Sequence, residues 1–513
     1  MPTLASPARA VVTLAVSLLA ACGGAQSPAE APASLDRAPG LVSACRTAAT
    51  QHAQAIKDLA YLPPKLRVLK WIDEPAPEAD GMIPEADLLE GLRSGRARFV
   101  HVQARGGIGK TEMSKAIAAE ICNTVPTFRA DLRELYLQPT PAGDNKLLGA
   151  VAVLSGMGAP EQRAGLIEML GRQRWVLVLD SIEELPAARR PDALAALADI
   201  RSQFKPVQVV VMGRPAVFDV AYGLQGLDGH FEVPPLDCGR ARSNLTRMSE
   251  DDEDKARMAT FVEAWHLDRQ SLVGQQCYFP YLATYRDVQV VQRLAKTFKP
   301  DEEMGGLRSN LATVHEAILA ERLLKELQHM GWDGPKALGL VDAMVSNGAI
   351  VDGDWNLAFK LERCVQGQPG TANVEALQVC EKLFQSVLFE PMVATMPQWK
   401  FGHQMIADLF VARWIEAQLA KAPGNCDVVT QQTEMIAGKE VAGYLVGRPF
   451  GAKCLAQVAR ALCKQGGFKK NDVTMLHKGL PLGPARAEAV KAAVDWEAKN
   501  GKDACGSKVV GAL

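Results

Sequence analysis

Glycines, a lysine and a threonine stand between an apolar segment and a segment of helical periodicity. The run reads Ala104-Arg105-Gly106-Gly107-Ile108-Gly109-Lys110-Thr111. Residues 98–102 before it are apolar enough for a buried strand, and apolar residues recur at helical spacing from Met113 to Ile121. In this context, backbone N–H groups and a helix N-terminus can hold a polyphosphate. Lys110 would then reach the β- and γ-phosphates, and the Thr111 hydroxyl would ligate Mg²⁺.

This run matches the pattern G-x-x-x-x-G-K-[ST] at every position but the first, where Ala104 replaces the glycine. A helix N-terminus with capping glycines would look similar. Other polar residues that could act on a phosphate are therefore needed to decide between the two interpretations.

Three acids form a second candidate cluster. Asp180 follows the apolar run Trp175 to Leu179, about 70 residues after Lys110, and Glu183 and Glu184 lie on the next turn. Because ligands bind at the carboxyl ends of parallel strands, Asp180 would hold Mg²⁺. Glu183 and Glu184 would orient an attacking water. A solvated acidic helix start is the alternative, and the abrupt end of so apolar a strand favours the functional interpretation.

A third apolar run, Val207 to Met212, ends in Gly213-Arg214-Pro215. An arginine at the end of a strand beside the metal strand can contact a γ-phosphate. A surface arginine before a helix would look the same, so the residues leave both interpretations open.

Three motifs, taken in their order along the chain, resemble those of the NACHT group of STAND P-loop NTPases: AxxxxGKT, LVLDSIEEL and VVVMGRP. The family's D-G-hydrophobic-D-E-L has Ser181 in place of glycine here, and its T-S-R-P has Gly213 before the arginine. FRADLREL upstream is similar to the family's strand ending in L-R-x-L. The resemblance covers about 61–420. It implies an α/β P-loop fold with a parallel sheet, of the ASCE/AAA-like type, followed by helical and winged-helix subdomains.

Two further residues gain a role from the resemblance. The line Phe401 to Ala412 is similar to F-x-H-x-x-x-x-E-[YF]-[LF]-x-A, with Asp408 replacing the glutamate. In the family the histidine reaches the β-phosphate of ADP and holds a closed state, which implies that role for His403. Pro280 falls where the family has a proline against adenine. A core histidine and a first-turn helix proline remain the alternatives.

The resulting domain expectation has six parts. They are a signal peptide (1–22), a flexible linker (23–40), a nucleotide-binding domain (41–235), a helical subdomain (236–345), a winged-helix-like subdomain (346–424) and a C-terminal helical region (425–513). The C-terminal region shows no leucine-rich, WD or tetratricopeptide repeat.

The resemblance implies a switch operated by ATP and ADP with Mg²⁺. ADP would hold a closed monomer, ATP would open it for self-association, and slow hydrolysis would reset it. Similar bacterial proteins act in signalling or phage defence, which implies a protein partner. A metabolic P-loop kinase is disfavoured because no lid arginine cluster is evident. The net charge of −1 gives no nucleic-acid signature.

The N-terminus reads as an export signal. Arg9 precedes an apolar run that ends in Leu19-Ala20-Ala21-Cys22, which resembles a lipobox with Cys22 as the acylated residue. A membrane-anchored lipoprotein whose degenerate NTPase fold only binds ligands is therefore the rival interpretation. ATP is scarce outside the cytoplasm, and a start codon placed too far upstream would make the protein cytoplasmic.

The eleven cysteines show neither CxxC pairs nor metal-ligand spacing. Cys122, Cys380 and Cys463, among others, lie in segments of helical pattern. We expect mostly buried free thiols rather than a disulfide framework.

Overall fold

A computed structural model provides the fold. It describes residues 47, 49–51, 54, 63–71, 81–132, 145–154, 159–185, 189–214, 226–273, 276–297, 310–348, 350–351, 354–355, 359–366, 373–393, 396–436, 440–463, 470–480 and 483–513. The signal segment, Cys22, the linker and Pro215 lie outside the described residues. Among those described, no helix is both long and apolar enough to span a bilayer.

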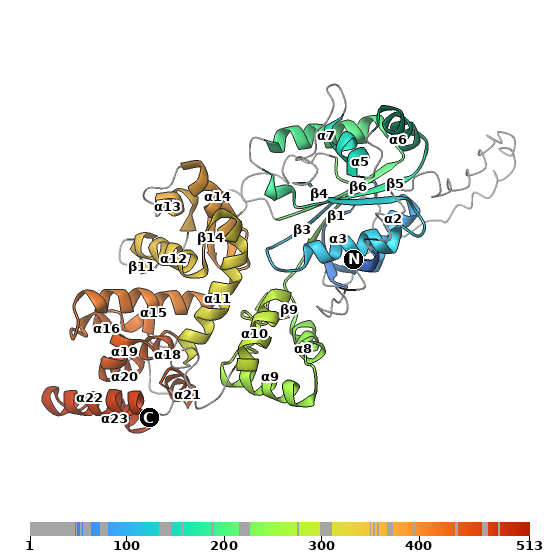
Figure 1. Cartoon of the computed structure of the whole chain (residues 1–513). Helices are drawn as coiled ribbons and strands as arrows, with labels where there is room; N and C mark the ends of the chain where they lie inside the picture. The colour runs from blue at the N-terminus through green and yellow to red at the C-terminus, as the bar shows by residue number, and fades with distance from the viewer. Residues whose placement is uncertain are drawn as a thin grey trace, which may run out of the picture.

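A seven-stranded sheet forms the body of the N-terminal half (Figure 1). Its order is β2 (Met82–Pro84), β1 (Lys65–Trp71), β7 (Gly229–Val233), β3 (Phe99–Ala104), β6 (Val207–Gly213), β5 (Trp175–Asp180) and β4 (Thr127–Asp131). The last five strands run parallel, and β1 and β2 add an antiparallel edge. The strand β6 lies between the loop strand β3 and the acidic strand β5. This is the ASCE/AAA-like arrangement, so the predicted fold class is confirmed.

Helices cover both faces of this sheet (Figure 1). One face carries α2 (Glu85–Ser94) and α3 (Lys110–Ile121), and the other carries α5 (Lys146–Leu154), α6 (Pro160–Arg172) and α7 (Arg190–Gln203). Alternate residues of a strand enter two separate cores: Val176 and Val178 face the core of α3, whereas Leu177 and Leu179 face that of α7. Burial on both faces explains why these strands are continuously apolar.

A small helical lobe follows β7. It holds α8 (Cys238–Arg247), α9 (Asp252–Ala264), a hairpin of β8 (Ser271–Val273) and β9 (Gln276–Tyr278), and α10 (Tyr285–Thr297). Tyr278 ends β9, and the next helix, α10, begins only at Tyr285. Pro280 therefore lies in the loop before α10 and is not a first-turn helix proline.

The next lobe contains a second sheet. It is antiparallel, with the order β12 (Phe359–Lys360), β14 (Met396–Phe401) and β13 (Phe389–Val393). Around it lie α11 (Leu311–Leu327), η5 (Gln328–Met330), α12 (Gly334–Gly348), β10 (Ile350–Val351), β11 (Asp354–Trp355), α13 (Leu361–Gln366), α14 (Asn373–Phe384) and α15 (Gln404–Lys421). The Phe401 and Phe410 rings stack at 5.2 Å and join β14 to α15. The predicted winged-helix boundaries stay a prediction.

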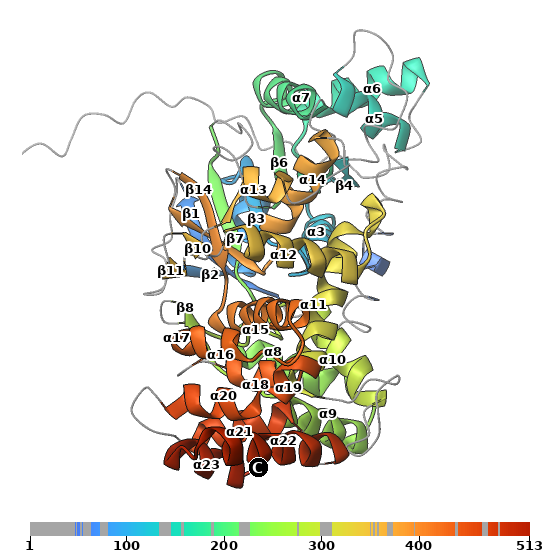
Figure 2. The same ribbon diagram turned by 90° about the vertical axis from the view of Figure 1, so that its left-hand side faces the viewer.

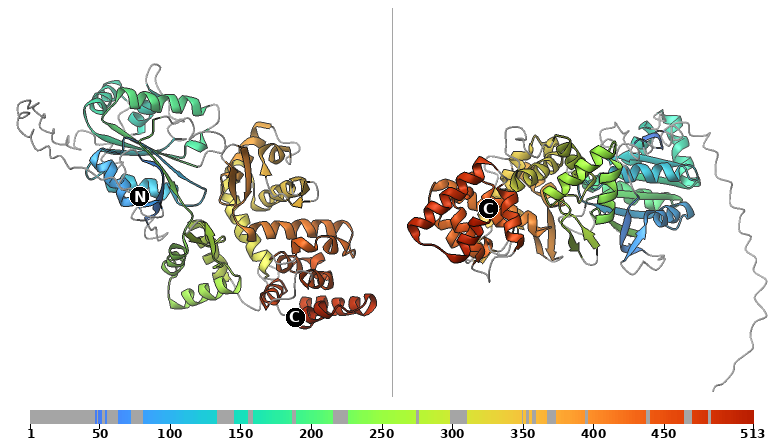
Figure 3. Two further views of the ribbon diagram at one scale, coloured as in Figure 1. Left: turned by 180° about the vertical axis from the view of Figure 1, so that it is seen from behind. Right: turned by 90° about the horizontal axis from the view of Figure 1, so that it is seen from below.

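Short helices complete the chain. They are α16 (Asp427–Gln431), α17 (Thr433–Ile436), α18 (Val441–Val446), α19 (Pro449–Lys453), α20 (Leu455–Cys463), α21 (Lys470–Gly479), α22 (Pro484–Asn500) and α23 (Ala504–Gly511). Figure 2 shows α20 to α23 at the end of the molecule away from the large sheet. Seen from below, the lobes follow one another from that sheet to the C-terminal helices (Figure 3).

Four disulfides contradict the expectation of mostly free thiols. The pairs are Cys238–Cys277, Cys364–Cys380, Cys426–Cys454 and Cys463–Cys505. Among the described cysteines, Cys122 alone lies outside these four pairs, and it is buried. Each pair joins neighbouring short elements at Cα–Cα distances of 5.5–5.9 Å, which suit a disulfide. Spacing along the sequence does not encode this pairing.

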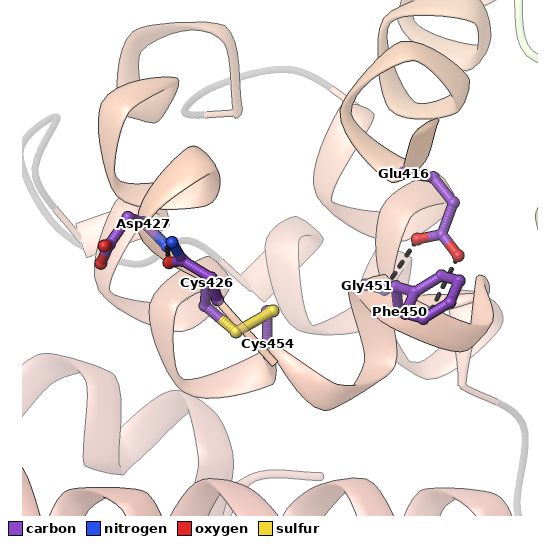
Figure 4. The surroundings of a disulfide bond; sticks show 7 residues. Glu416, Cys426, Asp427, Phe450, Gly451 and Cys454 are labelled. Carbon is purple, nitrogen blue, oxygen red and sulfur yellow. Dashed lines mark hydrogen bonds between the residues drawn. A yellow bond between two sulfur atoms is a disulfide. The ribbon is translucent and has the colours of Figure 1, made fainter. Parts of the chain in front are cut away.

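One of these disulfides lies just beyond the C-terminal end of α15 (Figure 4). Cys426 and Cys454 join the start of α16 to that of α20. Nearby, the Glu416 carboxylate accepts the backbone N–H groups of Phe450 and Gly451, both at 2.8 Å. The disulfide and this carboxylate cap fix the short helices that lack a long apolar face of their own.

A buried hydrogen-bond network holds α11 against the neighbouring lobes. His315 bonds the Tyr444 hydroxyl at 2.7 Å and the Trp265 carbonyl at 2.8 Å, and the Tyr281 hydroxyl lies 3.3 Å from that of Tyr444. Burial lowers the pKa of His315 to about 3, so the ring is neutral at pH 7. One ring nitrogen therefore donates and the other accepts, and α11 is fixed in register.

Candidate nucleotide-binding site

The glycine loop has the backbone geometry of an anion site. Ala104 is the last residue of β3 and pairs with Val233. Its φ is not positive, which explains why alanine can replace the glycine of the pattern here. Gly107 and Gly109 have φ of 77° and 103°, where glycine is favoured. Gly109 caps α3, so the first N–H groups of the helix point into the loop.

The structure brings the start of α3 and the end of β5 together. The Ser114 hydroxyl donates to the Thr111 carbonyl at 2.7 Å, and the same oxygen lies 3.3 Å from Asp180 Oδ2. Arg129 of β4 donates Nε–H to Ser114 at 3.0 Å and Nη2–H to Asp180 at 3.1 Å. Asp180 is fully buried, so this guanidinium supplies the charge that its carboxylate needs.

The residues present fit an Mg²⁺ ion held mainly by a nucleotide. Asp180 Oδ1 has no hydrogen-bond partner among the described residues, and Thr111 is exposed at the start of α3. The described residues contain no cluster of three acidic, histidine or cysteine ligands. Mg²⁺ commonly uses one or two protein oxygens together with phosphates and water. The Arg129 charge beside Asp180 would weaken the attraction for the cation.

The two acids predicted to orient water, Glu183 and Glu184, follow a strained turn. Ser181 has φ 65° and ψ 45°, a left-handed conformation that suits the glycine found there in the resembling family. A non-glycine residue in this region costs about 1 kcal/mol or more. Glu183 and Glu184 then form the 3-10 turn η2 (Ile182–Glu184) directly after β5. Their position is that expected of water-orienting acids, and their role stays a prediction.

A pocket that is partly open to solvent lies beside Arg105 of the loop. It is lined from three lobes by Arg105, Pro280 and His403, together with Tyr278 and Glu232. The Arg105 guanidinium also donates to the Phe389 carbonyl of β13. The structure thus brings together the loop, the predicted adenine proline and the predicted phosphate histidine, although they are separated by up to about 300 residues.

His403 presents a hydrogen-bond donor to this pocket. Its Nδ1 accepts the Met405 N–H at 3.0 Å and so caps α15. Burial, with a smaller contribution from Arg269, lowers the pKa of His403 to about 4. The ring is therefore neutral at pH 7, and Nε2 carries the proton. The Tyr278 ring stands edge-on at 6.1 Å and its hydroxyl donates to the Gly402 carbonyl at 2.9 Å, which fixes the histidine backbone.

Asp408 plays a structural part. Its carboxylate accepts the Gln404 side-chain N–H at 2.6 Å and the Glu440 backbone N–H at 3.0 Å. It is 2% exposed. The acid in the signature line therefore ties α15 to the start of α18.

Arg214 follows β6 as expected, but it forms an ion pair with Glu326 of α11. Both side chains are buried, at 8% and 5% exposure. The Glu326 carboxylate also lies against Gly106, because a methyl group added to that glycine would overlap Glu326 Oε1 and Cδ. An acidic side chain thus sits at the glycine loop.

Sequence reasoning missed Arg129, Ser114 and Glu326. The first two stand at recognisable places, since Arg129 lies in the FRADLREL strand and Ser114 in the first turn of the loop helix. Glu326 stands in an ordinary amphipathic helix, where one acid among several gives no signal.

Comparisons with known proteins are limited. No protein-family model matches the sequence, and no curated protein matches it. Among solved structures, the chain is similar to the Holliday junction branch migration motor RuvB of Thermotoga maritima, with a TM-score of 0.31, 13% identity, and coverage of 60% of this chain and 87% of RuvB. It is also similar to a katanin structure, with a TM-score of 0.24, 14% identity, and coverage of 52% and 83%. Nothing about function follows from similarities this low.

The Arg129–Asp180 pair yields a prediction. Arg129→Leu leaves a buried carboxylate without a counter-charge, so the free energy of unfolding should fall by about 3–5 kcal/mol. Millimolar Mg²⁺ should recover part of the loss, since the cation can take the place of the guanidinium. Urea unfolding with and without MgCl₂ measures both effects.

Arg172→Leu is the matched control. Arg172 pairs with Glu168 at 2.8 Å, but both side chains are exposed, at 74% and 61%, so the loss should stay under about 1 kcal/mol. Equal losses in the two variants would contradict the proposed role of Arg129.

Proposed function

We propose that the chain is a nucleotide-binding switch of the NACHT/STAND type. The observation that carries the proposal is the pocket at the glycine loop, where Arg105, Pro280 and His403 arrive from three different lobes. A nucleotide in this pocket would contact all three lobes. A diphosphate and a triphosphate would therefore favour different packings of the lobes. Such a difference in affinity for two conformations is what a ligand-operated switch requires.

Each residue then has a defined task. Lys110 and the loop N–H groups hold the phosphates, and Thr111 and Asp180 hold Mg²⁺, which would neutralise phosphate charge when bound. Glu184, with Glu183, orients water for slow hydrolysis, and Arg214 contacts the terminal phosphate. The neutral His403 donates Nε2–H to the β-phosphate of ADP. Positioning and charge stabilisation supply the rate enhancement, with no covalent step.

In this proposal ADP favours the closed arrangement and ATP favours an open one that self-associates. A protein partner or stimulus would promote the exchange, and stress signalling or phage defence would be the setting. The proposal rests on the site and on the resemblance of its motifs.

Nucleotide binding is tested at Lys110. Lys110→Ala should lower the affinity for a fluorescent ADP analogue by about 30- to 150-fold, because charge-assisted contacts of about 2–3 kcal/mol are lost. Fluorescence anisotropy with Mg²⁺ present measures the change, and circular dichroism verifies folding.

Lys115→Ala provides the control. Lys115 lies in the same helix but pairs with Glu112 at 2.8 Å, so the variant should bind like the wild type. Equal affinity of the Lys110→Ala variant and the wild type would rule out a phosphate role for the loop.

A second candidate function is an exported, lipid-anchored module that binds its ligand without hydrolysis. Two observations favour it. The four disulfides are typical of proteins that fold in an oxidising compartment. In addition, Arg129 already neutralises Asp180, which lowers the need for Mg²⁺. The lipobox-like segment ending at Cys22 would provide the anchor.

Export is tested by the redox state of the cysteines in cells. We expect the eight paired cysteines to react with a maleimide reagent only after reduction, and Cys22→Ser to abolish fatty-acid labelling and release the protein from membranes. Gel-shift and metabolic-labelling assays measure the two effects. Rapid maleimide labelling without reductant, with no change in the Cys22→Ser fractionation, would place the body in the cytoplasm.

A further inference from the structure

Glu326 occupies an unusual position for an acid. It lies in the last turn of α11, with its carboxylate against Gly106 of the loop and paired with Arg214. The loop and the arginine are the two features that we expect to bind an anionic phosphate. The carboxylate therefore stands as an internal anion between two anion-binding groups.

The contact of Glu326 with Arg214 and Gly106 is buried, so a phosphate cannot bind there without displacing the carboxylate. Glu326 and Arg214 are nearly inaccessible to water, so each charge stabilises the other, and the positive charge of Arg286 also acts on Glu326. Gly106 has no space for a side chain because Glu326 fills it. The carboxylate and a terminal phosphate that contacts Gly106 and Arg214 cannot occupy this space together.

The helix α11 cannot release Glu326 alone. One turn earlier, Arg322 donates to Asp287 at 2.7 Å and to the Pro280 carbonyl at 3.0 Å, in a fully buried setting. Asp287 also accepts the Thr284 N–H at 2.8 Å. The same helix face thus holds the start of α10 and the adenine-side proline.

Two residues at the start of α10 complete the closure. Thr284 lies over Gly107 and Tyr285 lies over Gly109, so close that an added methyl group would touch each of them. Removing Glu326 from the loop would therefore disturb α10, α11 and Pro280 as one unit.

We infer that Glu326 is a built-in competitor of the terminal phosphate of a nucleoside triphosphate, so that triphosphate binding and the closed packing of α11 exclude one another. The inference rests on the proposed function and adds an autoinhibitory contact to it. A diphosphate, which lacks the group that would reach Arg214, is compatible with the closed packing. The contact thus discriminates ATP from ADP.

The test compares nucleotide affinities of the full-length, disulfide-intact chain. Glu326→Gln keeps the side-chain shape and removes the charge. It should raise the affinity for a fluorescent ATP analogue at least ten-fold and the affinity for the matching ADP analogue less than three-fold. Glu321→Gln is the control, because Glu321 lies on the same helix but pairs with the exposed Arg293 at 2.9 Å. It should leave both affinities unchanged.

The outcomes separate the inference from the proposed function. If Glu326→Gln binds ATP like the wild type while Lys110→Ala weakens nucleotide binding as predicted, the inference fails and the proposed function stands. If neither the wild type nor Glu326→Gln binds a nucleotide, both fail.

A measurement on the wild type decides the case in which Glu326→Gln does not fold. Trp332, 6% exposed, lies five residues after the end of α11, just beyond η5. ATP, but not ADP, should shift its emission, and Trp332→Phe should remove that part of the signal. Emission that ATP leaves unchanged would overturn the inference.

Discussion

The structure depends on the cost of burying charge at the carboxyl edge of the sheet. A carboxylate or guanidinium removed from water is tolerated only when a partner of opposite charge or well-placed hydrogen bonds compensate for the lost hydration. Three such pairs surround the loop: Arg129 with Asp180, Arg214 with Glu326, and Arg322 with Asp287. The last two link α11 to the sheet and to α10, so the closed packing of the lobes depends on charges at the site itself. A ligand that brings three or four negative charges must change this balance.

The disulfides place a second constraint on the interpretation. Cys238–Cys277 joins α8 to the strand that carries Gln276 and Tyr278, both of which line the pocket. One wall of the pocket is thus covalently fixed, whereas α11, which contacts the loop but does not line the pocket, is held by ion pairs. Movement on ligand binding is therefore expected mainly in α11. The same bridges favour an oxidising environment, in which little ATP would be present, and this gives the binding-module alternative its weight.

The sequence predicted what is encoded locally. The glycine loop, the helix that follows it and the buried strands follow from periodicity and turn residues, and the structure has them within a few residues. Ser181 was recognised as a departure, and its positive φ explains why glycine is favoured there. Contacts between distant segments were not predictable. Glu326 meets Gly106 across about 220 residues, and the cysteine pairs depend on how short helices pack. The alternative of a first-turn helix proline fails at Pro280, because β9 extends to Tyr278 and α10 starts only at Tyr285.

The central claim is that the loop exchanges an internal carboxylate for a nucleotide phosphate. Amide hydrogen exchange of the full-length protein tests it most directly, with peptides that cover residues 104–112 and 322–330 followed in the presence and absence of Mg²⁺ and a non-hydrolysable ATP analogue. The account predicts slower exchange in the loop, because its N–H groups bind phosphate, together with faster exchange at the end of α11, because Glu326 has been displaced. Slower exchange in both peptides, or no change in either, would contradict it.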